Sequence, residues 1–166
     1  MTLVTGEVGE EFVARMGSAL TQAGLPRVPS LVFSALLVDD DGRMTASELA
    51  GALHLSAGSI SGAVRYLEQV GMARRERERG SRRDVYVVDD DAWHEALMRT
   101  DRVYAPMIAA LNRGLDGIGA GSTAHQRLLL TREFLRFVDH EMTGLTQRWE
   151  KRRAEILQEA PGLGRR

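Results

Sequence analysis

The sequence predicts a mainly α-helical protein that contains one small β-hairpin. Thr45 and Glu48 form a T-x-x-E capping box, which marks the start of a short helix. Ser56 is a typical capping residue for a second helix a few positions later. Two segments, 72–79 and 84–88, then have the composition of strands that flank a Gly-Ser turn. The expected order is therefore helix, tight turn, helix and hairpin.

The amino-terminal part of the chain predicts two helices before the capping box. An apolar stripe drifts along residues 7–23, and the segment GLP after it ends that helix. Pro29 favours the first turn of a second helix, 30–38, which is apolar over most of its surface and is expected to be buried. The acidic turn 39–42 lacks the spacing of a calcium-binding loop, so we interpret it as a solvated turn rather than a metal site.

The helix that Ser56 caps has two different faces. Its core-facing side follows an i, i+3, i+4, i+7 pattern made by Ile60, Ala63, Val64 and Leu67. Its opposite side carries Gly58, Ser61, Gly62, Arg65 and Gln69. A glycine inside an exposed helix costs about 1 kcal/mol relative to alanine. The two glycines therefore favour a surface that another molecule approaches closely, such as a DNA groove. The alternative is that Gly58 lies in a frayed first turn and Gly62 is merely tolerated.

The hairpin carries most of the arginines of this region, namely Arg74, Arg75, Arg77, Arg79, Arg82 and Arg83. Guanidinium groups suit phosphate oxygens and the major-groove edge of guanine, because they donate two parallel hydrogen bonds. The alternation RRERER also fits a solvated ribbon, in which Arg82 and Arg83 pair with Glu76 and Glu78. Because the hairpin follows two capped helices directly, we predict a winged helix-turn-helix whose wing contacts DNA phosphates.

Residues 89–166 predict two long helices. The three aspartates at 89–91 complement the positive end of a helix that we expect to run to about Gly114 and to bend at Pro106. Large apolar side chains on the two helices are a candidate pocket for a small apolar or amphipathic effector. They are Trp93, Met98, Tyr104, Met107, Phe134 and Phe137. The alternative is that these residues belong to an ordinary core.

The last helix is predicted to start at a capping box of Thr123 and Gln126 and to end near Glu159. Apolar residues recur along it every seven positions, at Leu128, Leu135, Met142, Trp149 and Ile156, with Val138 and Leu145 at a matching second position. Such a helix would span about 54 Å, which one small domain does not cover, so we expect a second subunit to pack against it. An intramolecular helical hairpin with residues 89–117 is the alternative.

Length, charge and composition limit the remaining possibilities. The 166 residues suit one domain with extensions. The net charge of −1 conceals an uneven distribution, because residues 45–88 contain seven arginines and only five acidic residues. With no cysteine, thiol chemistry, disulfides and cysteine-ligated zinc are excluded. The four histidines form no metal-binding motif, and no hydrolase or phosphate-loop motif occurs, so we expect no enzyme, no metal and no cofactor. We also expect no signal peptide, no membrane segment and a cytoplasmic location.

Three segments within about residues 20–90 are characteristic in combination: GLPRVPSLVFSALLV, MTASELAGALHLSAGSISGAVRYLEQVGMARR and GSRRDVYVV. On these segments the chain resembles the MarR family of bacterial transcription regulators, and more closely its GbsR-like branch. The resemblance implies a homodimer in which the terminal helices form the interface and two winged helices grip a pseudo-palindromic site. It also implies recognition roles for Ser59, Ser61 and Arg65 and a wing role for Arg82 and Arg83.

Together these observations predict three parts: a dimerisation helix (1–29), a winged helix-turn-helix DNA-binding domain (30–88), and two long helices (89–166) for dimerisation and effector binding. The predicted DNA-binding residues are Thr45, Ser47, Ser56, Gly58, Ser59, Ser61, Gly62, Arg65, Arg79, Ser81, Arg82 and Arg83. The predicted dimer interface contains Phe12, Met16, Leu20, Leu135, Met142, Leu145, Trp149 and Ile156.

The predicted function is a sequence-specific DNA-binding transcriptional regulator. We expect a repressor that acts as a homodimer on a pseudo-palindromic operator and that a small-molecule effector releases. The alternative is a winged-helix module that binds protein and has no specific DNA binding. That alternative favours an apolar or acidic outer face on the second helix, whereas Arg65 and its neighbouring serines favour nucleic acid.

Overall fold

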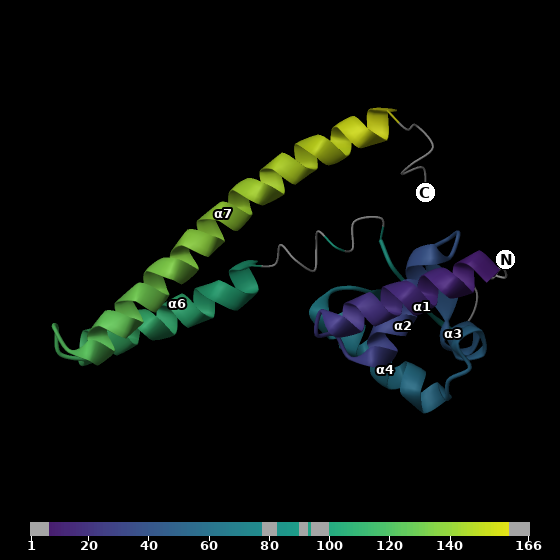
Figure 1. Cartoon of the computed structure of the whole chain (residues 1–166), viewed down its shortest axis with the longest axis horizontal. Coiled ribbons are helices and arrows are strands. Elements are labelled where there is room, and N and C mark those ends of the chain that lie inside the picture. The colour runs from purple at the N-terminus through teal and green to yellow at the C-terminus, as the bar shows by residue number, and fades with distance from the viewer. Residues whose placement is uncertain (1–6, 78–82, 90–92, 94–99, 160–166) are drawn as a thin grey trace. The chain divides into compact units, whose positions relative to one another are not determined.

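The computed structural model confirms a mainly helical fold with a small antiparallel sheet (Figure 1). It describes residues 7–77, 83–89, 93 and 100–159. The chain divides into two compact units, Met1–Ala96 and Leu97–Arg166. The predicted site residues Arg79, Ser81, Arg82 and Met98 lie outside the described residues.

Two helices open the first unit, α1 (Glu7–Gln22) and α2 (Arg27–Val38), and they pack against each other. Gly17 on α1 permits this contact, because a Cβ atom there would lie only 2.7 Å from Leu31 Cδ2. Helix α2 begins three residues earlier than the sequence predicted. Pro29 still lies in its first turn, where the missing N–H has no helical partner to lose.

The helix-turn-helix consists of α3 (Ala46–Leu53) and α4 (Ala57–Val70). The predicted capping box is present: Thr45 Oγ1 accepts from Glu48 N at 3.2 Å, and Thr45 N donates to Glu48 Oε2 at 2.7 Å. Helix α3 ends at His54, whose left-handed backbone (φ 53°) makes the tight turn. Ser56 caps α4, as predicted, by accepting from Ser59 N at 3.2 Å.

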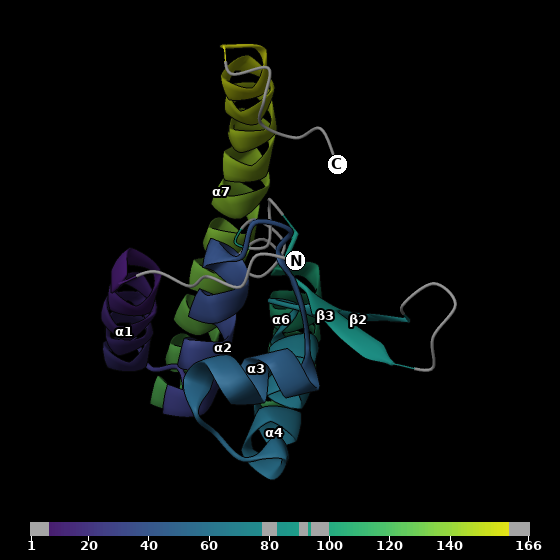
Figure 2. The same cartoon turned by 90° about the vertical axis from the view of Figure 1, so that its right-hand side faces the viewer.

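The sheet has one strand more than the predicted hairpin. Strand β1 (Arg43–Thr45) pairs antiparallel with β3 (Asp84–Val87), and β3 pairs antiparallel with β2 (Arg74–Arg77), so the order is β1-β3-β2. Figure 2 shows the β2–β3 hairpin projecting to one side of α3 and α4. Three residues are too few for an alternating pattern to indicate a strand, which is why the sequence did not predict β1.

One apolar core holds the helices and the sheet of this unit together. The side chains that are completely or almost completely buried in it are Val32, Phe33 and Leu36 of α2, Leu49 of α3, Ile60, Val64 and Leu67 of α4, and Met44 of β1. The predicted stripe of α4 is thus confirmed as its core face. On α3, Leu49 is buried and Ala50 packs against the core, whereas Ala52 is exposed.

The second unit is a pair of helices, α6 (Thr100–Gly117) and α7 (Thr123–Glu159), which lie side by side (Figure 1). Helix α6 continues to Gly117 rather than ending near Gly114. The cap of α7 is Ser122, not Thr123: Ser122 Oγ accepts from His125 N at 3.1 Å, and Thr123 is the first helical residue.

Candidate nucleic-acid interface

The solvent-facing side of α4 is the first part of the candidate interface. Ser59, Ser61 and Arg65 are exposed on it, as predicted, while the opposite side of the helix is buried. Arg65 Nη2 donates to Ser61 Oγ at 3.4 Å, one helical turn away. Ser59 Oγ lies 2.9 Å from Ser56 Oγ, and either hydroxyl can be the donor. This face therefore presents hydroxyl groups and a guanidinium, which are suited to base edges and phosphates.

Two glycines lie on this exposed side, Gly58 in the first turn of α4 and Gly62 further along the helix. A Cβ atom built on Gly62 would meet no atom within 4 Å, and one on Gly58 would meet only Ser56 Oγ at 3.9 Å. Neither glycine has the left-handed backbone that requires glycine. Packing within the chain therefore gives no reason for these glycines, in contrast to Gly17 on α1.

The start of each helix of the helix-turn-helix supplies further polar groups. Ser47 is exposed in the first turn of α3, and Ser56 is exposed as the cap of α4. Thr45 is half-buried, and its hydroxyl is occupied in the capping box, donating to Glu48 Oε2 at 2.9 Å. Of these three predicted DNA-contacting residues, Thr45 thus has a structural role as the cap of α3.

The arginines at the base of the wing differ in their ion pairing. Arg75 Nη1 lies 3.3 Å from Asp84 Oδ2, and Arg75 Nε lies 3.8 Å from Glu68 Oε1. Arg77 is exposed and has no ion-pair partner among the described residues. Arg83 is exposed immediately before β3.

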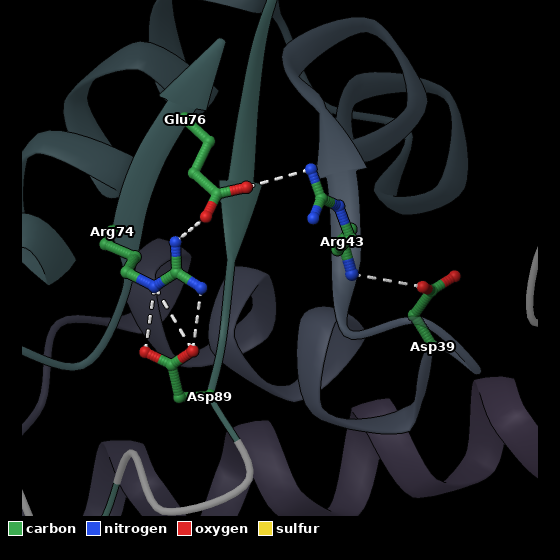
Figure 3. Close-up of polar contacts among 5 residues, drawn as sticks. All are labelled: Asp39, Arg43, Arg74, Glu76 and Asp89. Carbon is green, nitrogen blue, oxygen red and sulfur yellow. Dashed lines mark hydrogen bonds and ion pairs between the residues drawn. The ribbon is translucent and has the colours of Figure 1, made fainter. Parts of the chain in front are cut away.

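A chain of four charged side chains, which we call the polar bridge, crosses the sheet (Figure 3). Arg43 Nη2 of β1 lies 2.9 Å from Glu76 Oε2 of β2, and Glu76 also pairs with Arg74. Arg74 in turn donates to both carboxylate oxygens of Asp89, from Nε at 3.1 and 2.9 Å and from Nη2 at 2.9 Å. Among the described residues, Glu76 thus pairs with Arg43 and Arg74, whereas the solvated-ribbon alternative assigned it to Arg82 and Arg83.

Among the described residues, the pKa values of Asp89, just after β3, and of Tyr86, on β3, depart from their ordinary range. Hydrogen bonds from the Arg74 side chain hold the pKa of the Asp89 carboxyl below its usual value. Burial raises the pKa of the Tyr86 hydroxyl, and the nearby charge of Asp84 adds to that effect. Asp89 is therefore ionised, and Tyr86 neutral, at neutral pH.

The predicted effector residues are divided between the two units. Trp93 belongs to the first unit, where its ring packs edge-to-face on Phe33 with centroids 5.3 Å apart. On α6, Tyr104 is half-buried and Met107 is exposed. Phe134 and Phe137 on α7 expose 61% and 63% of their surface, so the described part of the chain does not enclose them.

The predicted dimer residues also differ in exposure. Leu20 is buried in the core of its own unit, and Leu135 is buried in the helix pair, so neither offers much surface to a partner. Phe12 of α1 and Leu145 and Trp149 of α7 expose between 36% and 42% of their surface. Met16, Met142 and Ile156 are half-buried.

The polar bridge is the feature that sequence reasoning missed. The alternation RRERER suggested cross-strand pairs in general. In the structure, Glu76 pairs with Arg43, 33 positions before it in the printed sequence, and Asp89 pairs with Arg74, 15 positions before it. Only the unpredicted strand β1 brings Arg43 to the sheet, so no local signal indicated this pairing.

The described residues contain no helix that is both long and apolar enough to cross a membrane. Within the same residues, no three His, Cys, Asp or Glu side chains gather in a way that would hold a metal ion.

Comparison with known proteins agrees with this architecture. A model of the MarR family matches residues 23–84, and a model described as "MmpR5-like MarR family transcriptional regulator" matches residues 91–152. The chain is 30% identical over 146 residues to the HTH-type transcriptional regulator MmpR5 of Mycobacterium tuberculosis, which covers 87% of this chain and 88% of that protein. A crystal structure of a transcriptional regulator is 28% identical, with a TM-score of 0.76, over 87% of this chain and 99% of that one. The capped helix-turn-helix, the wing and these matches together show that the chain belongs to the MarR family of DNA-binding transcriptional regulators.

Proposed function

We propose that this protein is a repressor that binds a pseudo-palindromic DNA operator as a homodimer, with α4 in the major groove and the wing on adjacent phosphates. The observation that carries the proposal is the outer face of α4. There Ser59, Ser61 and Arg65 are exposed around two glycines that leave the helix backbone bare. Such a face fits a groove closely and offers donors to base edges. Within the family, the three segments quoted above favour the GbsR-like branch.

The DNA-binding proposal is tested with duplexes that the protein itself selects from a random-sequence pool. Arg65→Ala should cost about 1–3 kcal/mol of binding free energy on a selected duplex and less on a random duplex, because a base contact carries sequence information and a phosphate contact does not. Fluorescence anisotropy titrations measure both. An equal loss on the two duplexes would reduce Arg65 to a phosphate contact.

The homodimer is supported by α7. At 1.5 Å per residue its 37 residues span about 55 Å, while the 18 residues of α6 span about 27 Å. The carboxy-terminal part of α7 therefore extends beyond α6, as Figure 1 shows. Leu145 and Trp149 expose apolar surface in this part of the chain, and a second copy would cover it.

Light scattering on the intact chain and on a 1–140 truncation tests the dimer. The intact chain should have the mass of two copies, and the truncation should be a monomer because it lacks Leu145, Trp149 and Ile156. An intact chain that is monomeric at micromolar concentration would refute the dimer.

We also propose an effector site on α6 and α7. Met107 on α6 and Phe134 and Phe137 on α7 are exposed apolar side chains, which suit a small apolar or amphipathic molecule once a partner encloses them. We further propose that the protein has no catalytic activity and acts in the cytoplasm of a bacterium, where its chromosomal target lies.

The competing function is a winged-helix module that binds protein. Its specific expectation is an apolar or acidic outer face on α4, and the exposed side chains there are serines, Arg65 and Gln69. Failure to select any sequence from the random pool would favour this competing function.

A further inference from the structure

The polar bridge joins two strands that are not neighbours. Because the strand order is β1-β3-β2, the contact between Glu76 of β2 and Arg43 of β1 has to cross β3. Arg43 and Arg74 are both register partners of Val87, one from each side. Residues in one row of a sheet point to the same face, so both arginines lie on the face over which Glu76 reaches. The bridge thus ties the two edges of the sheet together across its central strand.

Asp89 extends the bridge to the chain that leaves the sheet. It lies two residues beyond the end of β3, and Arg74 holds both of its carboxylate oxygens. Four residues further on, Trp93 packs on Phe33 in the core. Of the described residues after β3, Asp89 is thus held by the wing strand β2 and Trp93 by helix α2.

The composition of the bridge makes it a poor phosphate site. Two carboxylates neutralise its two guanidinium groups, so its four side chains carry no net charge. Their exposed fractions lie between 33% and 47%, and exposed ion pairs of this kind contribute little to global stability. A bidentate arginine–carboxylate pair nevertheless fixes the relative orientation of the segments that carry it.

We propose that Glu76 and Asp89 are positioning residues. By holding Arg74 and Arg43, they orient the wing toward DNA. Strand β1 ends at Thr45, the cap of α3, so a wing tied to β1 has a defined placement relative to the helix-turn-helix. This inference rests on the DNA contact of the wing proposed above, and it names the residues that set the direction of the hairpin.

Removing one carboxylate from the bridge distinguishes positioning from simple electrostatics. Asp89→Asn and Glu76→Gln each delete a negative charge, so long-range electrostatics alone predicts tighter DNA binding. Each substitution would also release Arg74 or Arg43 to bind a DNA phosphate. Positioning predicts the opposite sign: each variant should bind a duplex selected by the wild-type protein about three- to tenfold more weakly.

Three further variants separate the geometry of the bridge from its charge. Asp40→Asn makes the same charge change at an exposed carboxylate in the turn before β1, outside the bridge, and should not weaken binding. Asp89→Glu keeps a carboxylate for Arg74 and should restore most of the affinity. Arg74→Lys keeps the charge but loses the two-pronged hydrogen bond, and should weaken binding as Asp89→Asn does.

The salt dependence of DNA binding distinguishes a misdirected wing from partial unfolding, because a smaller folded fraction does not change its slope. If the wing is misdirected, the slope of log affinity against log salt should decrease in magnitude by about 0.9 for each phosphate contact that is lost. A variant that is only partly folded has fewer active molecules but an unchanged slope. Melting temperatures of all variants accompany the titrations.

The outcomes also separate this inference from the proposed function. Suppose that the double variant Arg82→Ala/Arg83→Ala binds DNA weakly, so that the wing contact is real. Unchanged or tighter DNA binding by Asp89→Asn and Glu76→Gln, with an unchanged salt slope, would then overturn the positioning role. If that wing variant binds like the wild type, the wing contact itself fails and the positioning role fails with it. Weaker binding with a smaller slope for both bridge variants, and wild-type binding for Asp40→Asn, supports the inference.

Discussion

Replacing Gly62 with alanine should change protein stability and DNA affinity in opposite directions. Gly62 lies inside α4, and a Cβ atom there would meet nothing within 4 Å. The free energy of unfolding should therefore rise by the full helix-propensity difference, about 0.8–1 kcal/mol. For a unit of this size, that corresponds to a melting temperature about 4–8 °C higher.

DNA binding should weaken in the same variant. If the major groove meets the bare backbone of α4, the added methyl group occupies space that the duplex needs. Overpacking of a close contact typically costs about 1–3 kcal/mol, which corresponds to about a 5- to 150-fold loss of affinity.

Thermal unfolding and anisotropy titration on a selected duplex measure the two effects of Gly62→Ala. Gly51→Ala is the matched control, because Gly51 is exposed on α3 and its Cβ would also meet nothing within 4 Å. The control should gain stability and keep its affinity. If Gly62→Ala gains stability and binds DNA like the wild type, the reasoning is refuted and the glycine is merely tolerated.

Two further predictions concern the wing and Asp89. Replacing Arg82 and Arg83 with alanine should weaken all duplexes similarly and reduce the salt slope by about 0.9 per lost phosphate contact; a larger loss on A·T-rich flanks would indicate insertion into the minor groove, and wild-type binding would contradict both. Because the pKa of Asp89 is lowered in the folded protein, its contribution to stability should be present above its unfolded pKa of about 4 and disappear as the pH falls through the folded pKa. Denaturant unfolding of the wild type and of Asp89→Asn over this range checks it, and a difference between them that persists in strong acid would be inconsistent with the Arg74 contact.

Local signals in the sequence predicted the helix-turn-helix well. Capping side chains act over three residues, so Thr45 with Glu48 and Ser56 with Ser59 could be recognised without knowledge of the fold. The stripe from Ile60 to Leu67 likewise follows from helix geometry alone, and the structure buries it. The same reasoning misplaced the cap of α7 by one residue, because Ser122 and Thr123 are both good caps.

Features that depend on contacts distant in the sequence were not predictable in this way. Strand β1 is recognisable only by its pairing with β3, and Arg43 becomes a neighbour of Glu76 only once that sheet forms. Leu20 shows the same limit: an apolar stripe on α1 indicates a buried face but not whether its own chain or a second copy covers it.

The length of α7 has a consequence for how this protein folds. Among the described residues of this unit, 100–159, no second helix packs against the turns of α7 beyond α6, and an isolated helix in water is only marginally stable. In the proposed dimer, these turns gain their order from the partner, so folding of α7 and association of two chains are one linked equilibrium. Dilution should therefore loosen the end of α7 as it separates the subunits, and the melting temperature of the second unit should rise with protein concentration.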